Sequence, residues 1–539
     1  MSKRIVWAFL IVCGMALYAS QAAISQSFRV QCPTSTITHP NAANNNSEPA
    51  FTGPTAMTLG AGGFLTPTAN VNGAIKCQQI SGGDGFATMA DGTQTFMFSF
   101  GPLSGLADIA AGQPGSEYPN VFNTVFPGTL QPGDPATTDG AAPTTLGNFT
   151  YNGAVGLAPD LDAQNDNGCK APCLDGHVDP RQIMDVGVMN GNIPAPLMAM
   201  DEDDEFFLTL SNVGMIMRPD LFEQHTVHFH GYPNASSFYD GVPDASVAIN
   251  IGGSFTYYYL APDAGTYFWH CHITPPEHLQ MGMVGQIFVR PRQNRVPSTT
   301  HLYTALQAQQ QDLRTACNPN TDILCSNPLP QKGDNGVTGG FTGGAATKKF
   351  AYNDGDGSTY YDVEYPIQIH GFDPNFHFVG MTFNPEAFVD MKDKYFLLNG
   401  RSYPDTVTPG PMQTETSDGR SHFSQPLPSI INITSGQKAL LRISDLDVTE
   451  YQTLASLGIP MQVIGYNAKL LRDQAGNNMY YSTNSITLAG GESLDVILDA
   501  SNTALYPSGS VFYLYTPQLD HLSNDAENFG GLMTEVHIN

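Results

Sequence analysis

Side chains that bind transition-metal ions are concentrated in two short segments of this sequence. The first segment reads His225-Thr-Val-His228-Phe-His230-Gly231. The second segment reads Trp269-His270-Cys271-His272 and is followed by His278 and Met283. Because six of the 14 histidines of the chain fall within these segments, metal binding is the first chemistry that they suggest.

Both segments are typical of β-strands, in which successive side chains point to opposite faces. On this pattern, His225 and Cys271 point away from the remaining strand histidines. Those remaining histidines share one face of two neighbouring strands and are His228, His230, His270 and His272. Strand alternation therefore predicts two separate groups of metal ligands.

The loop after the second strand completes the first group. Its ligands would be two imidazoles, a thiolate and a weak thioether, supplied by His225, His278, Cys271 and Met283. This is the ligand set of a blue, type 1 copper site, whereas zinc would gain nothing from a methionine. Met281 is a weaker candidate than Met283 for the axial position.

The second group offers four imidazoles and suits copper of type 2 or type 3. A single His-x-His pair on a strand is more often a surface or core feature than a pair of ligands. Two such pairs in register with a cysteine favour a metal site. Because Cys271 lies between His270 and His272, a few covalent bonds would connect the two sites, and we predict catalytic roles for these three residues in electron transfer.

Short strands joined by turns dominate the rest of the chain. Charged residues make up only 13% of it, while 54 glycines and 39 prolines favour turns, so we predict an all-β fold. Dense strand patterns predict two β-sandwich domains, at 185–292 and 355–539, joined by a polar linker at 293–354. Residues 24–184 read as a loop-rich N-terminal extension with one strand-like run, Thr93–Phe100.

The N-terminus and the cysteines indicate the compartment. Residues 1–23 have the basic start, apolar stretch and small-residue exit of a secretory signal peptide, so we expect a secreted or periplasmic protein. Six cysteines outside the signal and Cys271 suit three disulfides. Proximity favours the pairs Cys32–Cys77, Cys169–Cys173 and Cys317–Cys325, and the other connectivities stay open.

Charge and hydropathy exclude two kinds of partner. The formal net charge of −27, with no basic cluster to neutralise phosphates, argues against a nucleic-acid partner. The apolar stretch Ile5–Leu17 is too short for a stable membrane span. The acidic run Asp201–Glu205 precedes a predicted strand and could attract cations, but runs of charge are usually solvated faces, so we expect it to be solvated.

The two metal-binding segments resemble those of multicopper oxidases, whose motifs run His-x-x-His-x-His-Gly and His-Cys-His-Ile-x-x-His with a Gly-Met ending. Ile273 and Gly282-Met283 also match. Pro275 and Pro276 lengthen the spacing before the last histidine, which brings it closer to that of copper nitrite reductases. The resemblance covers about 185–292 and, more weakly, 395–539, and it implies two cupredoxin-like Greek-key sandwiches.

The same resemblance implies a function. The protein would take single electrons from a small molecule, a metal ion or a redox protein at the type 1 copper. It would pass them through Cys271 to the His-ligated copper, where dioxygen would be reduced.

The resemblance is incomplete in the second domain. The family's oxygen-reducing cluster uses eight histidines, four from each of two domains, but Leu457–Ile464 and Tyr513–Thr516 stand where the second set is expected. His521 could instead supply an imidazole to a neighbouring subunit, as in the homotrimeric copper nitrite reductases. A nitrite reductase-like enzyme and a non-enzymatic blue-copper electron carrier therefore stay open as alternatives.

Overall fold

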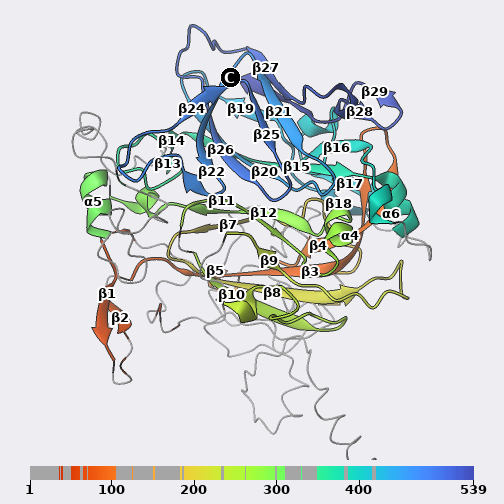
Figure 1. The fold of residues 1–539 in the computed structure, drawn as a ribbon, viewed down its shortest axis with the longest axis horizontal. Helices are drawn as coiled ribbons and strands as arrows, with labels where there is room; N and C mark the ends of the chain where they lie inside the picture. The colour runs from red at the N-terminus through yellow and green to blue at the C-terminus, as the bar shows by residue number, and fades with distance from the viewer. Residues whose placement is uncertain are drawn as a thin grey trace, which may run out of the picture.

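The computed structural model describes residues 50–104, 187–309 and 349–539 with short gaps, together with small isolated pieces elsewhere. The described chain consists mostly of β-strands with few helices, which confirms the predicted fold class (Figure 1). None of its helices is long and apolar enough to cross a membrane. Cys77 is disulfide-bonded, and the other cysteines of the predicted pairs lie outside the described residues, as does the N-terminal apolar stretch.

The first domain is a sandwich of two four-stranded sheets. One sheet has the order β10-β8-β3-β4, with bounds Ser254–Leu260, Glu205–Gly214, Ile75–Thr88 and Gln94–Pro102. The other sheet has the order β7-β12-β11-β9, with bounds Met198–Asp201, Val284–Arg290, Gly265–His270 and His228–Phe229. Buried apolar side chains of both sheets, such as Phe98 and Trp269, pack between them and form one core.

Two strands of this sandwich come from the region for which the sequence predicts a loop-rich extension. β3 pairs with β8 in parallel and with β4 in antiparallel orientation, so the sheet extends across the predicted boundary at residue 185. The strand character of β3 is concealed by Gly82, Gly83 and Gly85, since glycine is depleted in strands. Glycine is needed at position 85 because the backbone at Gly191 passes close to β3. A β-carbon on Gly85 would lie 2.5 Å from the carbonyl oxygen of Gly191.

The second domain pairs a nine-stranded sheet with a five-stranded one. Eight strands of the larger sheet lie in the order β23-β22-β26-β20-β15-β16-β28-β29, with bounds Lys469–Leu470, Met461–Tyr466, Ser493–Asp499, Lys438–Asp445, Val363–Phe372, Tyr395–Leu398, Ser523–Asn524 and Glu527–Asn528. The ninth strand, β24 (Tyr481–Thr483), pairs with β22. The smaller sheet has the order β19-β30-β27-β21-β25, with bounds Ile431–Ile433, Met533–Ile538, Val511–Tyr515, Gln452–Leu457 and Ser485–Leu488.

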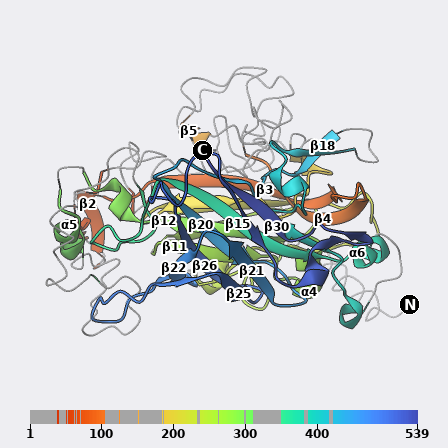
Figure 2. The ribbon, with the colours of Figure 1, turned by 90° about the horizontal axis from the view of Figure 1, so that it is seen from above.

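The two domains stack through their inner sheets. In Figure 1 the sheet of β7, β11 and β12 lies between the other sheet of the first domain and the large sheet of the second. Strand β11 contacts β20 and β26, and the hydroxyl of Thr266 donates a 2.7 Å hydrogen bond to Asp495. Two helices, α5 (Leu302–Gln309) and α6 (Pro374–Gly380), lie at opposite ends of the stack in Figures 1 and 2.

Glu202–Glu205 are buried and Asp201 is partly buried, which corrects the expectation that the acidic run is a solvated face. Arg292 forms a 2.7 Å ion pair with Asp203, and Lys76 forms a 2.7 Å pair with Asp204. Since both basic partners are distant in sequence, the run itself does not reveal that its charges are compensated inside the protein.

Candidate metal centres

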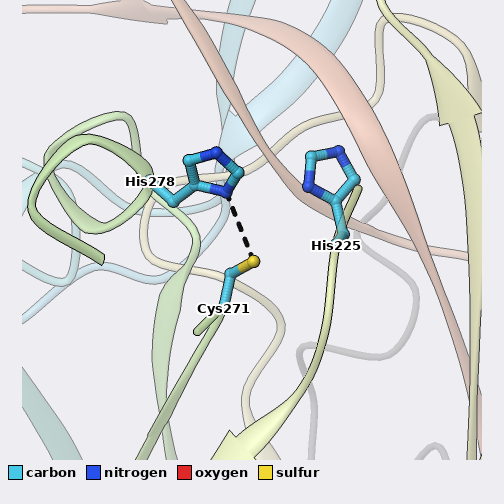
Figure 3. Close-up of side chains that lie close together, drawn as sticks. All are labelled: His225, Cys271 and His278. Carbon is cyan, nitrogen blue, oxygen red and sulfur yellow. Dashed lines mark hydrogen bonds between the residues drawn. The ribbon is translucent and has the colours of Figure 1, made fainter. Parts of the chain in front are cut away.

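Three residues of the first predicted group converge between the sheets of the first domain. His225 forms an isolated β-bridge with Ile249, Cys271 directly follows β11, and His278 lies on the short helix α4 (Pro275–Gln280). The Cys271 sulfur and one ring nitrogen of each histidine lie within 4.8 Å of one another. Figure 3 shows the two imidazoles facing the thiol.

The polar atoms of this cluster have too few protein partners. All three residues are buried, Cys271 is a free cysteine, and neither ring nitrogen of His225 has a hydrogen-bond partner in the described structure. Unpaired buried polar atoms cost stability unless another partner satisfies them. Burial, followed by the nearby charge of His278, lowers the pKa of His225 well below its ordinary value, so this imidazole stays neutral and able to bind a metal.

His278 contacts both the thiol and the partly exposed Glu223. Its Nδ1 atom lies 3.3 Å from the Cys271 sulfur, and its Nε2 atom lies 3.6 Å from a Glu223 oxygen. Burial lowers the pKa of His278, but Cys271 and Glu223 outweigh that effect and raise it to about 9. A metal ion bound here must displace the proton that His278 holds at this raised pKa. One sulfur and two imidazoles form a donor set that fits copper.

Met283 is fixed by the two ligands that precede it. Its N–H donates a 2.8 Å hydrogen bond to the His278 carbonyl, and its own carbonyl accepts a 3.0 Å bond from the Cys271 N–H. The end of the Met281 side chain lies beside α6 (Pro374–Gly380). A β-carbon added to Gly380, the last residue of that helix, would be 3.1 Å from the terminal carbon of Met281. Met283 remains our predicted axial ligand.

The strands β3 and β4 also border this site, although the two metal-binding motifs do not predict their contribution. The Phe98 ring lies 5.1 Å from the His278 ring, and the Phe100 ring lies 6.3 Å from that of His225. Gly82 leaves room for His225, since a Cβ there would lie 2.7 Å from the imidazole. Only the strand pattern of Thr93–Phe100 offered a signal for any of these contacts.

The second predicted group assembles at the edge strand β9 and its neighbour β11. His228 and His270 are direct partners in the strand register, and Nε2 of His230 lies 3.1 Å from Nε2 of His270. Donor atoms of these three residues lie within 4.8 Å of one another. The His272 ring lies 5.0 Å from the His228 ring, so the structure brings all four predicted histidines together.

Backbone carbonyls orient two of these imidazoles. Nδ1 of His228 lies 2.6 Å from the Asp240 carbonyl, and Nδ1 of His270 lies 2.7 Å from the Cys271 carbonyl. Such bonds fix the tautomer and leave Nε2 for a metal. Burial is the largest cause that lowers the pKa of His230 to about 4 and that of His270 to about 3, so both are neutral ligands near pH 7.

A cavity of about 510 Å³ opens beside this cluster. The first domain lines it with His230, His270 and Phe268, and the second domain lines it with Asp447 and Glu450. The second cluster is therefore reached from a space between the domains, whereas the first cluster is buried.

His521 lies apart from both clusters. Its ring is buried and stacks on Phe396 at 3.8 Å, its Nδ1 lies 3.0 Å from Gln452 Oε1, and its Nε2 lies 3.4 Å from Glu450. Neither metal-ligand group found in the described chain contains a histidine of the second domain.

Known proteins resemble the region that contains these clusters. A sequence model of a family described as multicopper oxidase matches residues 175–294. A multicopper oxidase of Talaromyces pinophilus is 33% identical over 146 residues, which cover 26% of this chain and 22% of the relative. A laccase of Aspergillus fumigatus is 33% identical over 109 residues, 20% of this chain and 17% of the relative. The chain thus matches only about a fifth of the length of these relatives.

Solved structures of copper oxidases are also similar to this chain. The multicopper oxidase mgLAC is 15% identical, with a TM-score of 0.46 and coverage of 86% of this chain and 87% of that one. The blue copper oxidase of Nitrosomonas europaea is 20% identical, with a TM-score of 0.41 and coverage of 65% and 78%.

The two clusters place the donor atoms of two candidate metal sites on one β-sandwich domain. Residues 175–294 match the family model described as multicopper oxidase, which confirms the resemblance predicted from the two motifs. The cofactor of this family is copper, in agreement with the donors of both clusters.

Proposed function

We propose that this protein is a secreted or periplasmic copper-dependent oxidoreductase that takes single electrons from a reductant and reduces dioxygen. The observation that carries the proposal is the position of Cys271, whose sulfur belongs to the first cluster while its neighbours His270 and His272 belong to the second. Copper bound at these ligands would supply the one-electron redox chemistry.

Cys271 offers two short routes between the clusters. One route follows the covalent bonds from its sulfur through the backbone to His270 or His272. The other crosses the 2.7 Å contact between the Cys271 carbonyl and Nδ1 of His270. Electrons would enter near His278, because the partly exposed Glu223 lies beside it. They would leave at the second cluster, because that cluster faces the cavity.

The cavity suits a small acceptor that consumes protons. Reducing dioxygen to two waters takes four electrons and four protons. Glu450 lines the cavity, and burial raises the pKa of its carboxyl above the ordinary value, which favours a role for this group in proton transfer. The electron donor would be a small molecule, a metal ion or a redox protein that approaches the partly exposed Glu223 beside His278.

Secretion is supported by the N-terminal signal pattern and by the disulfide at Cys77, since disulfides persist in oxidising compartments. Detection of the mature chain outside the cytoplasm, with its N-terminus near residue 24, would support this part of the proposal. A full-length chain retained in the cytoplasm would contradict it.

Turnover measurements separate the candidate activities. The copper-loaded protein is supplied with a one-electron reductant, and consumption of dioxygen is followed in one experiment and consumption of nitrite under argon in another. We expect sustained dioxygen uptake that is lost in His270→Gln. Turnover with nitrite but not with dioxygen would favour the nitrite reductase-like alternative. Reduction of the copper without turnover of either acceptor would favour the non-enzymatic electron carrier.

A further inference from the structure

The last turn of α4 carries a ligand of the first cluster and leads directly to Met283. The carbonyls at the end of a helix lack partners within the helix and must find them elsewhere. The His278 carbonyl accepts from Met283 N–H, and the Leu279 carbonyl accepts from Gly282 N–H at 2.9 Å. The next carbonyl, that of Gln280, is contacted by the second domain.

His377 of α6 provides that contact. Its Nε2 atom lies 2.9 Å from the Gln280 carbonyl, its Nδ1 atom lies 2.7 Å from the Phe96 carbonyl in β4, and its ring stacks on Phe372 at 3.7 Å. Burial lowers the pKa of His377 to about 3, so the neutral ring donates to one carbonyl at a time. One fully buried imidazole therefore connects α6, β4 and the ligand-bearing helix.

Two further residues of the second domain contact the same turn. His370 of β15 is buried, and its Nε2 atom lies 3.1 Å from the Leu279 carbonyl. The Gln280 side chain donates a 2.9 Å hydrogen bond to Asp393. Leu279 and Gln280, the two residues that follow His278, are thus both held by the second domain.

We propose that His377, assisted by His370, is a positioning residue of the first metal site, through which the second domain fixes His278 and Met283. This inference rests on the part of the proposed function that assigns copper to the first cluster, and it does not depend on the electron acceptor. Groups that orient metal ligands from outside the ligand set typically change metal affinity by about 10- to 100-fold when they are removed.

His377→Phe in the full-length protein tests this role, because phenylalanine keeps a ring to stack on Phe372 but has no N–H. We expect the copper affinity of the blue site to fall by about 10-fold or more. We also expect a change in its visible spectrum and reduction potential. His377→Gln, which keeps a donor, should restore part of both properties. The matched control is His537→Phe, since His537 is a partly exposed histidine of β30 whose Nε2 contacts Glu535.

A His377→Phe protein with the copper affinity, spectrum and potential of the wild type would overturn the inference. If that variant does not fold, the milder His370→Gln and His377→Gln variants are compared by the same three readouts, and wild-type values in both would also overturn it. A fall in melting temperature with an unaltered blue site would indicate a structural role only. A wild-type protein without a blue band would instead contradict the proposed function itself.

Discussion

The two domains share an arrangement of strands but differ in what those strands carry. In the first domain β11 lies between β12 and β9, and in the second β27 lies between β30 and β21, each antiparallel to both neighbours. His270 faces His228 in the first pair, whereas Leu514 faces Ser456 in the second. The same architecture can therefore be built with or without candidate metal ligands, and these ligands depend on a few positions rather than on the fold.

The second domain contributes to the site in other ways. It supplies the cavity wall with Asp447 and Glu450, and it holds the helix that carries His278 through His370 and His377. A domain that lacks candidate ligands can therefore still line and orient the candidate metal site of its neighbour. Variants in each domain should therefore have separable effects.

The largest expected effect is that of Cys271→Ser, which removes the thiolate of the first cluster. We expect complete loss of the blue absorption, because a hydroxyl cannot replace the copper–thiolate bond, while copper in the second cluster remains. Visible spectra and copper analysis check this result. Thr453→Ser, at an exposed hydroxyl of β21 in the second domain, is the control and should keep the blue band. A blue Cys271→Ser protein would contradict the assignment.

Histidines of the two domains should differ in their effect on copper content. His270→Gln should lower the copper bound per chain by one or more while retaining the blue band, since it removes a second-cluster ligand. His521→Gln should leave the copper content unchanged, because the His521 ring stacks on Phe396 and its Nδ1 atom contacts Gln452 instead of joining a cluster. Loss of copper from the His521 variant would instead support a ligand donated to a neighbouring subunit.

Glu364, a carboxylate that pairs with one arginine of each domain, should contribute measurably to stability. Glu364 of β15 accepts a 2.9 Å bond from Arg290 of the first domain and a 3.0 Å bond from Arg442. Burial raises the pKa of Glu364, but the two arginines outweigh burial and lower it to about 2. A carboxyl with a lowered pKa stabilises the fold above its unfolded pKa of about 4.3, and this contribution disappears as the pH falls towards 2.

Glu364→Gln should therefore lower the free energy of unfolding at pH 7 by about 3 kcal/mol, because it leaves buried arginine charge unpaired. Denaturant unfolding at several pH values measures this difference. The gap between variant and wild type should narrow as the pH falls from about 4.3 to 2. A gap that does not depend on pH would contradict the assigned ion pair.

The smallest effect is expected from a substitution in β3, at Gly82. In Gly82→Ala the new methyl group would lie 2.7 Å from the His225 ring, which must shift. Overpacking of this kind typically costs about 1–3 kcal/mol. We therefore expect about 10-fold weaker copper binding, measured by competition with a chelator. Wild-type affinity would indicate that β3 does not constrain the ligand.

The ligands could be predicted because strand alternation and residue type act locally. Alternation alone separates His225 and Cys271 from the other strand histidines, and the structure brings together three members of each group: His225, Cys271 and His278 in one, and His228, His230 and His270 in the other. The contribution of β3 could not be predicted, since Gly82 and Gly85 meet partners that are distant in sequence. The contact of His377 with the Gln280 carbonyl could not be predicted either, because it joins residues that are distant in sequence and forms only when the domains pack.

The most direct test of a coupled pair of copper sites is the copper content of the purified full-length protein, combined with its visible and electron paramagnetic resonance spectra. We predict one blue copper and at least one further, non-blue copper per chain, with the blue signal dependent on Cys271 and the second on His270. A single blue copper with no further copper of any type would contradict the account.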